Sequence, residues 1–192
     1  MKIFLDTADT SIITKHFATG LIDGITTNPT LIKKSGRDPL EVYQELKDLG
    51  IKDISMEVVG DADEMIKEGK GLYDTFGDCC TVKVPCSPDG LRACRELSDK
   101  GIRVNVTLIF SQVQAILAAK VGARYVSPFV GRVDDNSFGG ICLVKDIVNV
   151  FKEHFTTTEV LAASVRNVRD VGRLFEHGAE IVTMPPAVFE KM

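Results

Sequence analysis

The chain has 192 residues, 44% of them hydrophobic and 26% charged, a composition typical of one soluble globular domain covering residues 1–192. The net charge of −4 excludes the basic surface needed to bind nucleic acid or an anionic membrane. No apolar run is long enough to cross a bilayer, and Asp6 follows the N-terminus too early for a signal peptide. We therefore expect a cytoplasmic protein with no nucleic-acid or membrane partner.

The five cysteines and three histidines do not form a metal-binding pattern. An odd number of cysteines without a secretory signal indicates reduced thiols in a reducing compartment. Cys79 and Cys80 are adjacent in the sequence, a spacing that zinc sites do not use. We expect no metal site.

Short runs typical of β-strands alternate with amphipathic helical stretches along the chain. In chain order, the eight expected strands are Lys2–Leu5, Ile22–Thr26, Asp53–Val58, Thr81–Val84, Arg103–Thr107, Arg124–Ser127, Glu159–Ala163 and Glu180–Thr183. Most of the expected helices begin at a residue suited to capping a helix N-terminus or at a first-turn proline. These start signals, in chain order, are Asp38-Pro39, Asp61, Ser87-Pro88, Ser111, Asn167 and Pro185-Pro186, with a further helix over 143–151.

Strand–helix alternation predicts a parallel sheet covered by helices. Eight units in 192 residues, about 24 residues each, fit a short (β/α)8 TIM barrel. The alternative is an open doubly wound sheet, which usually has five or six strands, and no Gly-x-Gly-x-x-Gly loop follows the first strand here. We predict an α/β fold, a single-domain closed barrel.

Polar residues interrupt strands that should be continuously apolar. Lys83 lies between two valines, and Asn105 and Thr107 alternate with valines in the next strand. Residues of one parity point to one side of a strand. The same rule selects Ser55 and Glu57 in the third strand, Tyr125, Ser127 and Phe129 in the sixth, and Ala162, Ser164 and Arg166 in the seventh.

These side chains, with Asp6 after the first strand and Asn28 after the second, are expected to meet at the carboxyl ends of the strands, where TIM barrels carry catalytic groups. Structural interpretations exist for each residue. Lys83 can form a buried ion pair with Glu57 or Asp6, and the others can satisfy strand ends, fill the core or form surface salt bridges. The shared parity and shared end favour a functional cluster, because buried charges are costly unless paired.

A lysine inside a barrel, close to carboxylates and hydroxyls, suits covalent amine catalysis. The neutral amine attacks a ketone and forms a Schiff base, which permits cleavage of an adjacent carbon–carbon bond. Glu57 and Asp6 can move the protons that this chemistry requires. Arg132 and Arg166 can bind a phosphate. The residues themselves predict a class I aldolase-type barrel acting on a phosphorylated ketose.

Six separated motifs, which together cover essentially the whole chain, resemble those of the transaldolase family, in particular its short single-domain members, which are similar to fructose-6-phosphate aldolases. The motifs are Asp6-Thr-Ala-Asp, Gly24-Ile-Thr-Thr-Asn28-Pro-Thr, Val82-Lys83-Val84-Pro85, Asn105-Val-Thr107-Leu-Ile-Phe-Ser, Ser127-Pro-Phe129-Val-Gly-Arg132 and Ala163-Ser164-Val-Arg166-Asn.

The resemblance implies transfer of a dihydroxyacetone unit from sedoheptulose 7-phosphate or fructose 6-phosphate to glyceraldehyde 3-phosphate or erythrose 4-phosphate, in the pentose phosphate pathway, without a cofactor or metal. It assigns the Schiff base to Lys83 and the acid–base step of carbon–carbon cleavage to Asp6. Glu57 and Thr107 would hold and activate water. Substrate binding would fall to Thr26, Asn28, Asn105, Ser127 and Phe129, and phosphate binding to Arg132, Ser164 and Arg166.

Two positions separate the sister activities within this resemblance. Fructose-6-phosphate aldolases of the group typically carry Gln where Glu57 stands and Tyr where Phe129 stands, so both residues here favour transaldolase. A tyrosine hydroxyl can place water near the imine, whereas phenylalanine leaves that spot dry until an acceptor arrives. The alternatives are an aldolase that releases free dihydroxyacetone and a non-catalytic barrel that binds sugar phosphates.

Family members usually continue past the Met184-Pro-Pro-Ala-Val-Phe motif into a further C-terminal helix, which covers the site mouth or a neighbouring subunit. This chain stops at Met192, so we expect a short version that lacks the extension helix. The resemblance implies a homo-oligomer, of a size that the missing helix leaves open.

Overall fold

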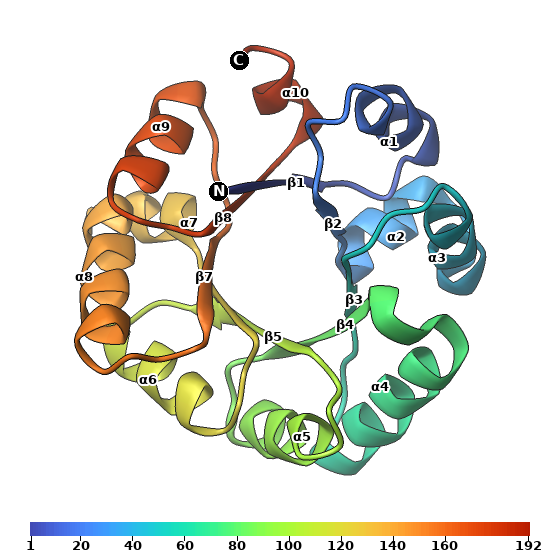
Figure 1. The fold of residues 1–192 in the computed structure, drawn as a ribbon, viewed down its shortest axis with the longest axis horizontal. Coiled ribbons are helices and arrows are strands. Elements are labelled where there is room, and N and C mark those ends of the chain that lie inside the picture. Colours follow the sequence, from blue (N-terminus) through green and yellow to red (C-terminus); the bar gives the residue numbers. More distant parts are fainter.

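The computed structural model describes all residues, 1–192, and contains a closed barrel of eight parallel strands surrounded by helices (Figure 1). The strands pair in sequence order, and β8 pairs with β1 to close the barrel. The predicted TIM barrel is confirmed, and the open doubly wound alternative is excluded.

All eight expected strands are present, with shifted ends. The strands are β1 (Lys2–Asp6), β2 (Gly24–Thr26), β3 (Ile54–Glu57), β4 (Cys80–Pro85), β5 (Val104–Ile109), β6 (Tyr125–Pro128), β7 (Glu159–Ala162) and β8 (Ile181–Met184). The helices are α1 (Thr10–Phe17), α2 (Pro29–Ser35), α3 (Pro39–Asp48), α4 (Ala62–Phe76), α5 (Pro88–Ser98), α6 (Gln112–Lys120), α7 (Val130–Asp135), α8 (Gly140–Glu153), α9 (Val168–Glu176) and α10 (Pro186–Phe189), with a 3₁₀ turn, η1, over Gly77–Cys79.

The helix start signals in the sequence act as expected. The side chains of five predicted caps accept hydrogen bonds from backbone N–H groups in the first helical turn, which satisfies donors that the helix leaves unpaired. These caps are Asp38, Asp61, Ser87, Ser111 and Asn167.

The alternation rule fails in β5 and just after β7, where the backbone enters the left-handed region. Leu108 has φ 59°, and the register of β5 against β6 shifts between Val106 and Ile109. Strict alternation also placed Ala162, Ser164 and Arg166 on the inner face of the seventh strand. That assignment is wrong for Ala162, which is buried in the main core, between strands and helices. Ser164 has φ 58°, so it reaches the inner face directly after Ala163.

The apolar core has two parts. The larger part fills the space between the strands and the helices, as expected for a parallel sheet that is covered on its outer face. The smaller part lies inside the barrel and consists of Phe4, Tyr125, Leu161 and Ile181. Tyr125 therefore belongs to an interior plug and not to the mouth, where the sequence pattern had placed it.

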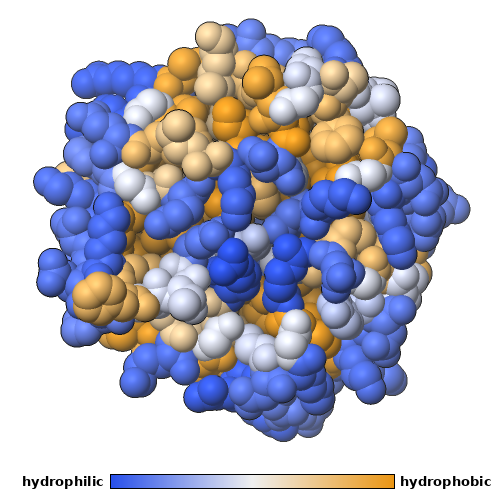
Figure 2. Space-filling view, viewed as in Figure 1, coloured by the Kyte–Doolittle hydropathy of each residue, from blue (hydrophilic) through white to orange (hydrophobic).

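Charged groups close the amino ends of the strands. The carboxylate of Asp53 accepts hydrogen bonds from the hydroxyls of Tyr125, at 2.6 Å, and Thr81, at 2.8 Å, and lies 3.1 Å from the guanidinium of Arg103. In Figure 1 the helices follow one another clockwise in chain order. Because β–α–β connections are right-handed, this order means that the view is from the amino ends of the strands. Figure 2 shows hydrophilic side chains over the centre of this end.

No helix of the structure is both long enough and apolar enough to span a membrane. The five cysteines are all free thiols.

Asp53→Ala should lower the free energy of unfolding by about 3 kcal/mol, because two buried hydroxyls and a guanidinium lose their shared acceptor. Urea denaturation measures the change, and Tyr125→Phe, which removes one donor only, should cost about 1 kcal/mol. Equal stability of Asp53→Ala and the parent chain would contradict the stabilising role given to the Asp53 carboxylate.

Candidate active site

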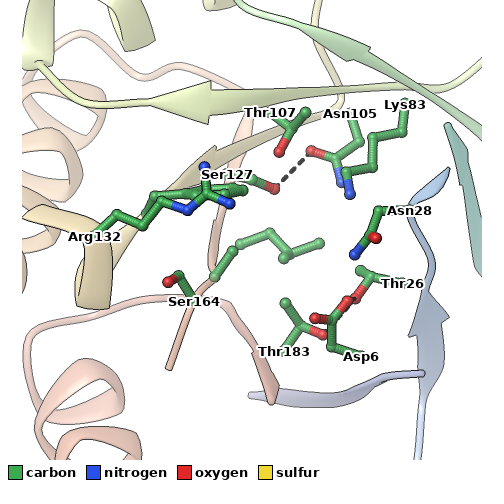
Figure 3. A pocket seen from close by; sticks show the side chains of 13 residues that line it. Asp6, Thr26, Asn28, Lys83, Asn105, Thr107, Ser127, Arg132, Ser164 and Thr183 are labelled. Carbon is green, nitrogen blue, oxygen red and sulfur yellow. Dashed lines mark hydrogen bonds between the residues drawn. The ribbon is translucent and has the colours of Figure 1, made fainter. Parts of the chain in front are cut away.

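A cavity of about 150 Å³ opens at the carboxyl ends of the strands, above the apolar plug (Figure 3). Every residue to which the family resemblance assigns a catalytic or binding role, except Glu57 and Arg166, lines it. The full lining is Asp6, Thr26, Asn28, Lys83, Asn105, Thr107, Ser127, Phe129, Arg132, Leu161, Ala163, Ser164 and Thr183. Leu161, Ala163 and Thr183 were not singled out from the sequence. Thr183 had a signal, because it is the one polar residue of the β8 run Ile-Val-Thr-Met.

Lys83 is the buried cation of this cavity, with 6% of the residue exposed. It is held by β4, whose neighbouring valines Val82 and Val84 pack outside the barrel. Its Nζ lies 2.9 Å from Oε2 of Glu57 and donates a 2.9 Å hydrogen bond to the carbonyl oxygen of Thr27. Glu57 is the register partner of Lys83 across β3 and β4. These two contacts offset the cost of burying the charge.

Asp6 lies at the end of β1 and is the last acceptor of a hydrogen-bonded chain that runs through Thr26 from Thr183 (Figure 3). The Thr26 hydroxyl donates to Oδ1 of Asp6 at 2.8 Å, and the hydroxyls of Thr26 and Thr183 are 2.7 Å apart. Because Thr26 gives its only proton to Asp6, Thr183 donates to Thr26. Burial raises the pKa of Asp6 above its ordinary value of 3.8, against the opposing effects of Lys83 and Thr26. A carboxyl group with a raised pKa is suited to take and return a proton near neutral pH.

Both polar atoms of the Asn105 side chain are hydrogen-bonded, whereas the Thr107 hydroxyl has no hydrogen-bond partner. The Ser127 hydroxyl donates to the Asn105 side-chain oxygen at 2.7 Å, and the Asn105 amide nitrogen donates to the Ser55 hydroxyl at 3.2 Å. Thr107 carries the only buried side-chain oxygen or nitrogen that lacks a hydrogen-bond partner in the protein. A buried hydroxyl without a partner costs free energy, so it marks a position suited to a bound polar atom.

Asn28 has a structural and a potential binding role at once. Its side-chain oxygen accepts from the backbone N–H of Leu31 at 3.0 Å and caps α2, which begins at Pro29. This bond fixes the amide group so that its nitrogen faces the cavity beside Asp6 (Figure 3).

The mouth of the cavity carries the aromatic ring of Phe129 and one cation. The guanidinium of Arg132, on α7, lies 5.2 Å from the Phe129 ring centre, and the Phe110 ring packs edge-on against Phe129 at 5.8 Å. Ser164 lies beside α7 at the mouth, where its carbonyl oxygen accepts from the backbone N–H of Gly131 at 3.0 Å. A side chain at Gly131 would collide with this carbonyl, so the close approach of α7 to Ser164 requires glycine.

Arg166 lies outside the cavity in this structure. Its guanidinium forms a two-pronged ion pair with the exposed carboxylate of Asp135. Arg132 is therefore the only arginine that lines the cavity. No group of three or more His, Cys, Asp or Glu side chains is arranged to hold a metal ion.

Comparison with known proteins shows which family the sequence matches. A family model described as transaldolase/fructose-6-phosphate aldolase matches residues 3–192. The chain is 50% identical to a probable transaldolase of Nitrosopumilus maritimus, covering 100% of this chain and 87% of that protein. Probable transaldolases of Ruegeria sp. and Caulobacter vibrioides are 49% and 50% identical, each covering 100% of this chain and 88% of the relative.

A distant solved structure has the same architecture. The L230A mutant of flavocytochrome b2 with benzoylformate superimposes with a TM-score of 0.64 at 14% identity, over 85% of this chain and 48% of that one. At that identity the similarity concerns the fold alone.

Asp6→Asn should raise the melting temperature at pH 7. The raised pKa of Asp6 means that the folded chain prefers the protonated form, so ionisation weakens folding as the pH rises above 3.8. Each unit of raised pKa costs about 1.4 kcal/mol once the group is ionised. Calorimetry should show that the gain from Asn shrinks as the pH falls towards 4. A lower melting temperature for the variant at pH 7 would mean that Lys83 and Thr26 outweigh burial.

Proposed function

The chain belongs to the transaldolase/fructose-6-phosphate aldolase family, and we propose that it is a transaldolase that carries a dihydroxyacetone unit as a Schiff base on Lys83. The observation on which the proposal rests is the buried Lys83 amine, 2.9 Å from the Glu57 carboxylate, inside a cavity that Asp6 also lines.

The Lys83–Glu57 pair holds the protons that imine formation consumes. Transfer of one proton from the ammonium to Glu57 leaves a neutral amine, which attacks the ketone carbon of the donor. The oxygen of the resulting carbinolamine then takes one proton from the nitrogen and one from Glu57, and leaves as water. The products are a protonated imine and the Glu57 carboxylate, so no outside acid is needed.

Carbon–carbon cleavage is assigned to Asp6. Its carboxylate takes the proton of the C4 hydroxyl, the bond between C3 and C4 breaks, and its electron pair enters the protonated imine to give an enamine. An aldehyde leaves, and an acceptor aldehyde enters and reacts by the reverse sequence. The raised pKa of Asp6 brings its proton affinity closer to neutral pH, which favours both directions of transfer.

The cavity lining supports a division between reacting and anchoring ends. Lys83 and Asp6 line the cavity together with Arg132 at its mouth, so a bound ketose phosphate would place its carbonyl carbon at Lys83 and its phosphate at Arg132. Asn28, Asn105 and Ser127 would bind the hydroxyls inside. Arg132 and Ser164 would bind the phosphate at the mouth. The planar guanidinium of an arginine can donate to two phosphate oxygens at once.

The finer assignments belong to the same proposal. The donors would be sedoheptulose 7-phosphate or fructose 6-phosphate and the acceptors glyceraldehyde 3-phosphate or erythrose 4-phosphate, in the pentose phosphate pathway. We also propose a cytoplasmic location and a homo-oligomeric state. The second candidate activity is fructose-6-phosphate aldolase; Glu57 beside Lys83 and the apolar Phe129 ring in the cavity favour transaldolase over it.

Glyceraldehyde 3-phosphate release from fructose 6-phosphate, measured with and without erythrose 4-phosphate, tests the activity. Release should require the acceptor, and Lys83→Ala should abolish it. Borohydride should also trap the donor on Lys83 of the parent chain. Release without acceptor would indicate the aldolase, and no release or trapping would indicate a barrel that binds sugar phosphates without reacting.

Phe129→Tyr should raise acceptor-independent cleavage about tenfold, because a hydroxyl at this position can hold water beside the imine. The same coupled assay measures it, with Phe129→Leu as the apolar control that should cause no rise. If the Tyr and Leu variants behave alike, exclusion of water at position 129 does not separate transaldolase from aldolase activity.

A further inference from the structure

A second hollow of about 700 Å³ lies outside the barrel, between α2, α3 and α4. We call it the α2–α4 groove. Its lining includes Tyr43 from α3, Gly71 and Leu72 from α4, and Pro29 from α2. Glu57 also lines the groove, although it does not line the substrate cavity.

The Lys83–Glu57 pair therefore connects two separate spaces. Lys83 lines the substrate cavity and Glu57 lines the α2–α4 groove, and their charged atoms are 2.9 Å apart. The Glu57 side chain keeps 13% of its surface accessible to solvent, compared with 8% for Lys83. The ion pair thus links a residue of the groove lining directly to the reacting nitrogen.

The proposed reaction needs water when the cavity is full. Formation of the imine releases one water molecule, and release of the product ketose consumes one. A ketose phosphate bound as proposed extends from Lys83 to Arg132 at the mouth, both of which line the cavity, so it occupies both the interior and the mouth. Water that reaches the imine through the mouth would have to pass the bound sugar.

We propose that the water of imine formation and hydrolysis passes through the α2–α4 groove, beside Glu57, and not through the substrate mouth. The inference rests on the proposed Schiff-base reaction. In hydrolysis, water gives one proton to the Glu57 carboxylate as its oxygen bonds to the imine carbon. The second proton of the water moves to the nitrogen, the carbon–nitrogen bond breaks, and Glu57 returns its proton to the amine.

Tyr43, which lines the groove, belongs to a hydrogen-bonded chain that leads through Thr27 towards Lys83. The Tyr43 hydroxyl donates to the Thr27 hydroxyl at 3.2 Å, and the Thr27 hydroxyl donates to the Ser55 carbonyl at 2.9 Å. The Thr27 carbonyl accepts from Lys83. The Tyr43 oxygen thus keeps a lone pair that can accept a further hydrogen bond. Burial raises the pKa of Tyr43 to about 12, so it remains a neutral hydroxyl that can bind water without competing with Glu57 for the proton.

Gly71 offers a direct way to obstruct the groove. It lies on the exposed surface of α4, and a Cβ built there meets no atom within 4 Å. Gly71→Trp should place an indole in the groove without disturbing the core, and Gly71→Ala is the matched control. Leu40→Trp obstructs the groove from α3, with Leu40→Ala as its control; Leu40 is 54% exposed.

The test is rapid-quench borohydride trapping with fructose 6-phosphate. Both Trp variants should slow the appearance of the trapped imine about tenfold, less than the roughly 10²–10⁴-fold that acid–base catalysis contributes because Glu57 itself is retained, with kcat reduced and KM unchanged. The trapped fraction at equilibrium should stay the same, because an obstructed route slows formation and hydrolysis equally. Both Ala variants should behave like the parent chain.

Parent-chain rates in both folded Trp variants would overturn the groove route while leaving the proposed activity intact. The same holds if the Trp and Ala variants lose rate equally, since that result would reflect a change in α4 or α3 and not obstruction. Absence of a trapped imine in the parent chain would overturn the proposed function and the route together.

Discussion

The burial of one ammonium group, that of Lys83, is the constraint on which the arrangement of the site depends. An unpaired charge inside a barrel costs far more than a typical domain can spare. Two acceptors offset that cost, the carboxylate of Glu57 and the carbonyl oxygen of Thr27. Both come from positions that the parallel register fixes, since β3 pairs with β4, and β2 with β3. The closed barrel therefore fixes the neighbouring backbone positions from which the amine and its proton acceptor extend.

The two ends of the barrel use polar groups in opposite ways. At the amino ends, the Asp53 carboxylate is satisfied by Tyr125, Thr81 and Arg103, and the apolar plug lies inside the barrel. At the carboxyl ends, the buried Thr107 hydroxyl has no partner, and burial raises the pKa of Asp6. Satisfied networks stabilise a fold, whereas unsatisfied groups lower its stability and are retained where they serve binding or chemistry. Stability and proposed function are thus separated along the barrel axis.

Two of the four non-glycine residues with positive φ lie at the same end of the barrel as the polar groups; the other two, Ser137 and Phe155, flank α8. Leu108 in β5 and Ser164 just after β7 both have positive φ. Such conformations cost non-glycine residues about 1–3 kcal/mol and cluster at functional sites. At Ser164 the turn brings two consecutive residues, Ala163 and Ser164, to the lining of the cavity, which regular alternation cannot do.

The sequence by itself determined the barrel and most of the cavity, because both depend on short-range periodicity. Strand–helix alternation predicted eight strands, and strand parity directed Lys83 and Asn105 inward. The tertiary structure decided what parity cannot encode. It placed Tyr125 in the interior plug and Ala162 in the outer core, it added Thr183 to the lining, and it set Arg166 against Asp135 outside the cavity. The depth of a residue along the barrel axis depends on strand tilt and register, and the direction of a side chain after a positive φ depends on the local turn. Neither quantity is contained in the alternation of apolar and polar residues.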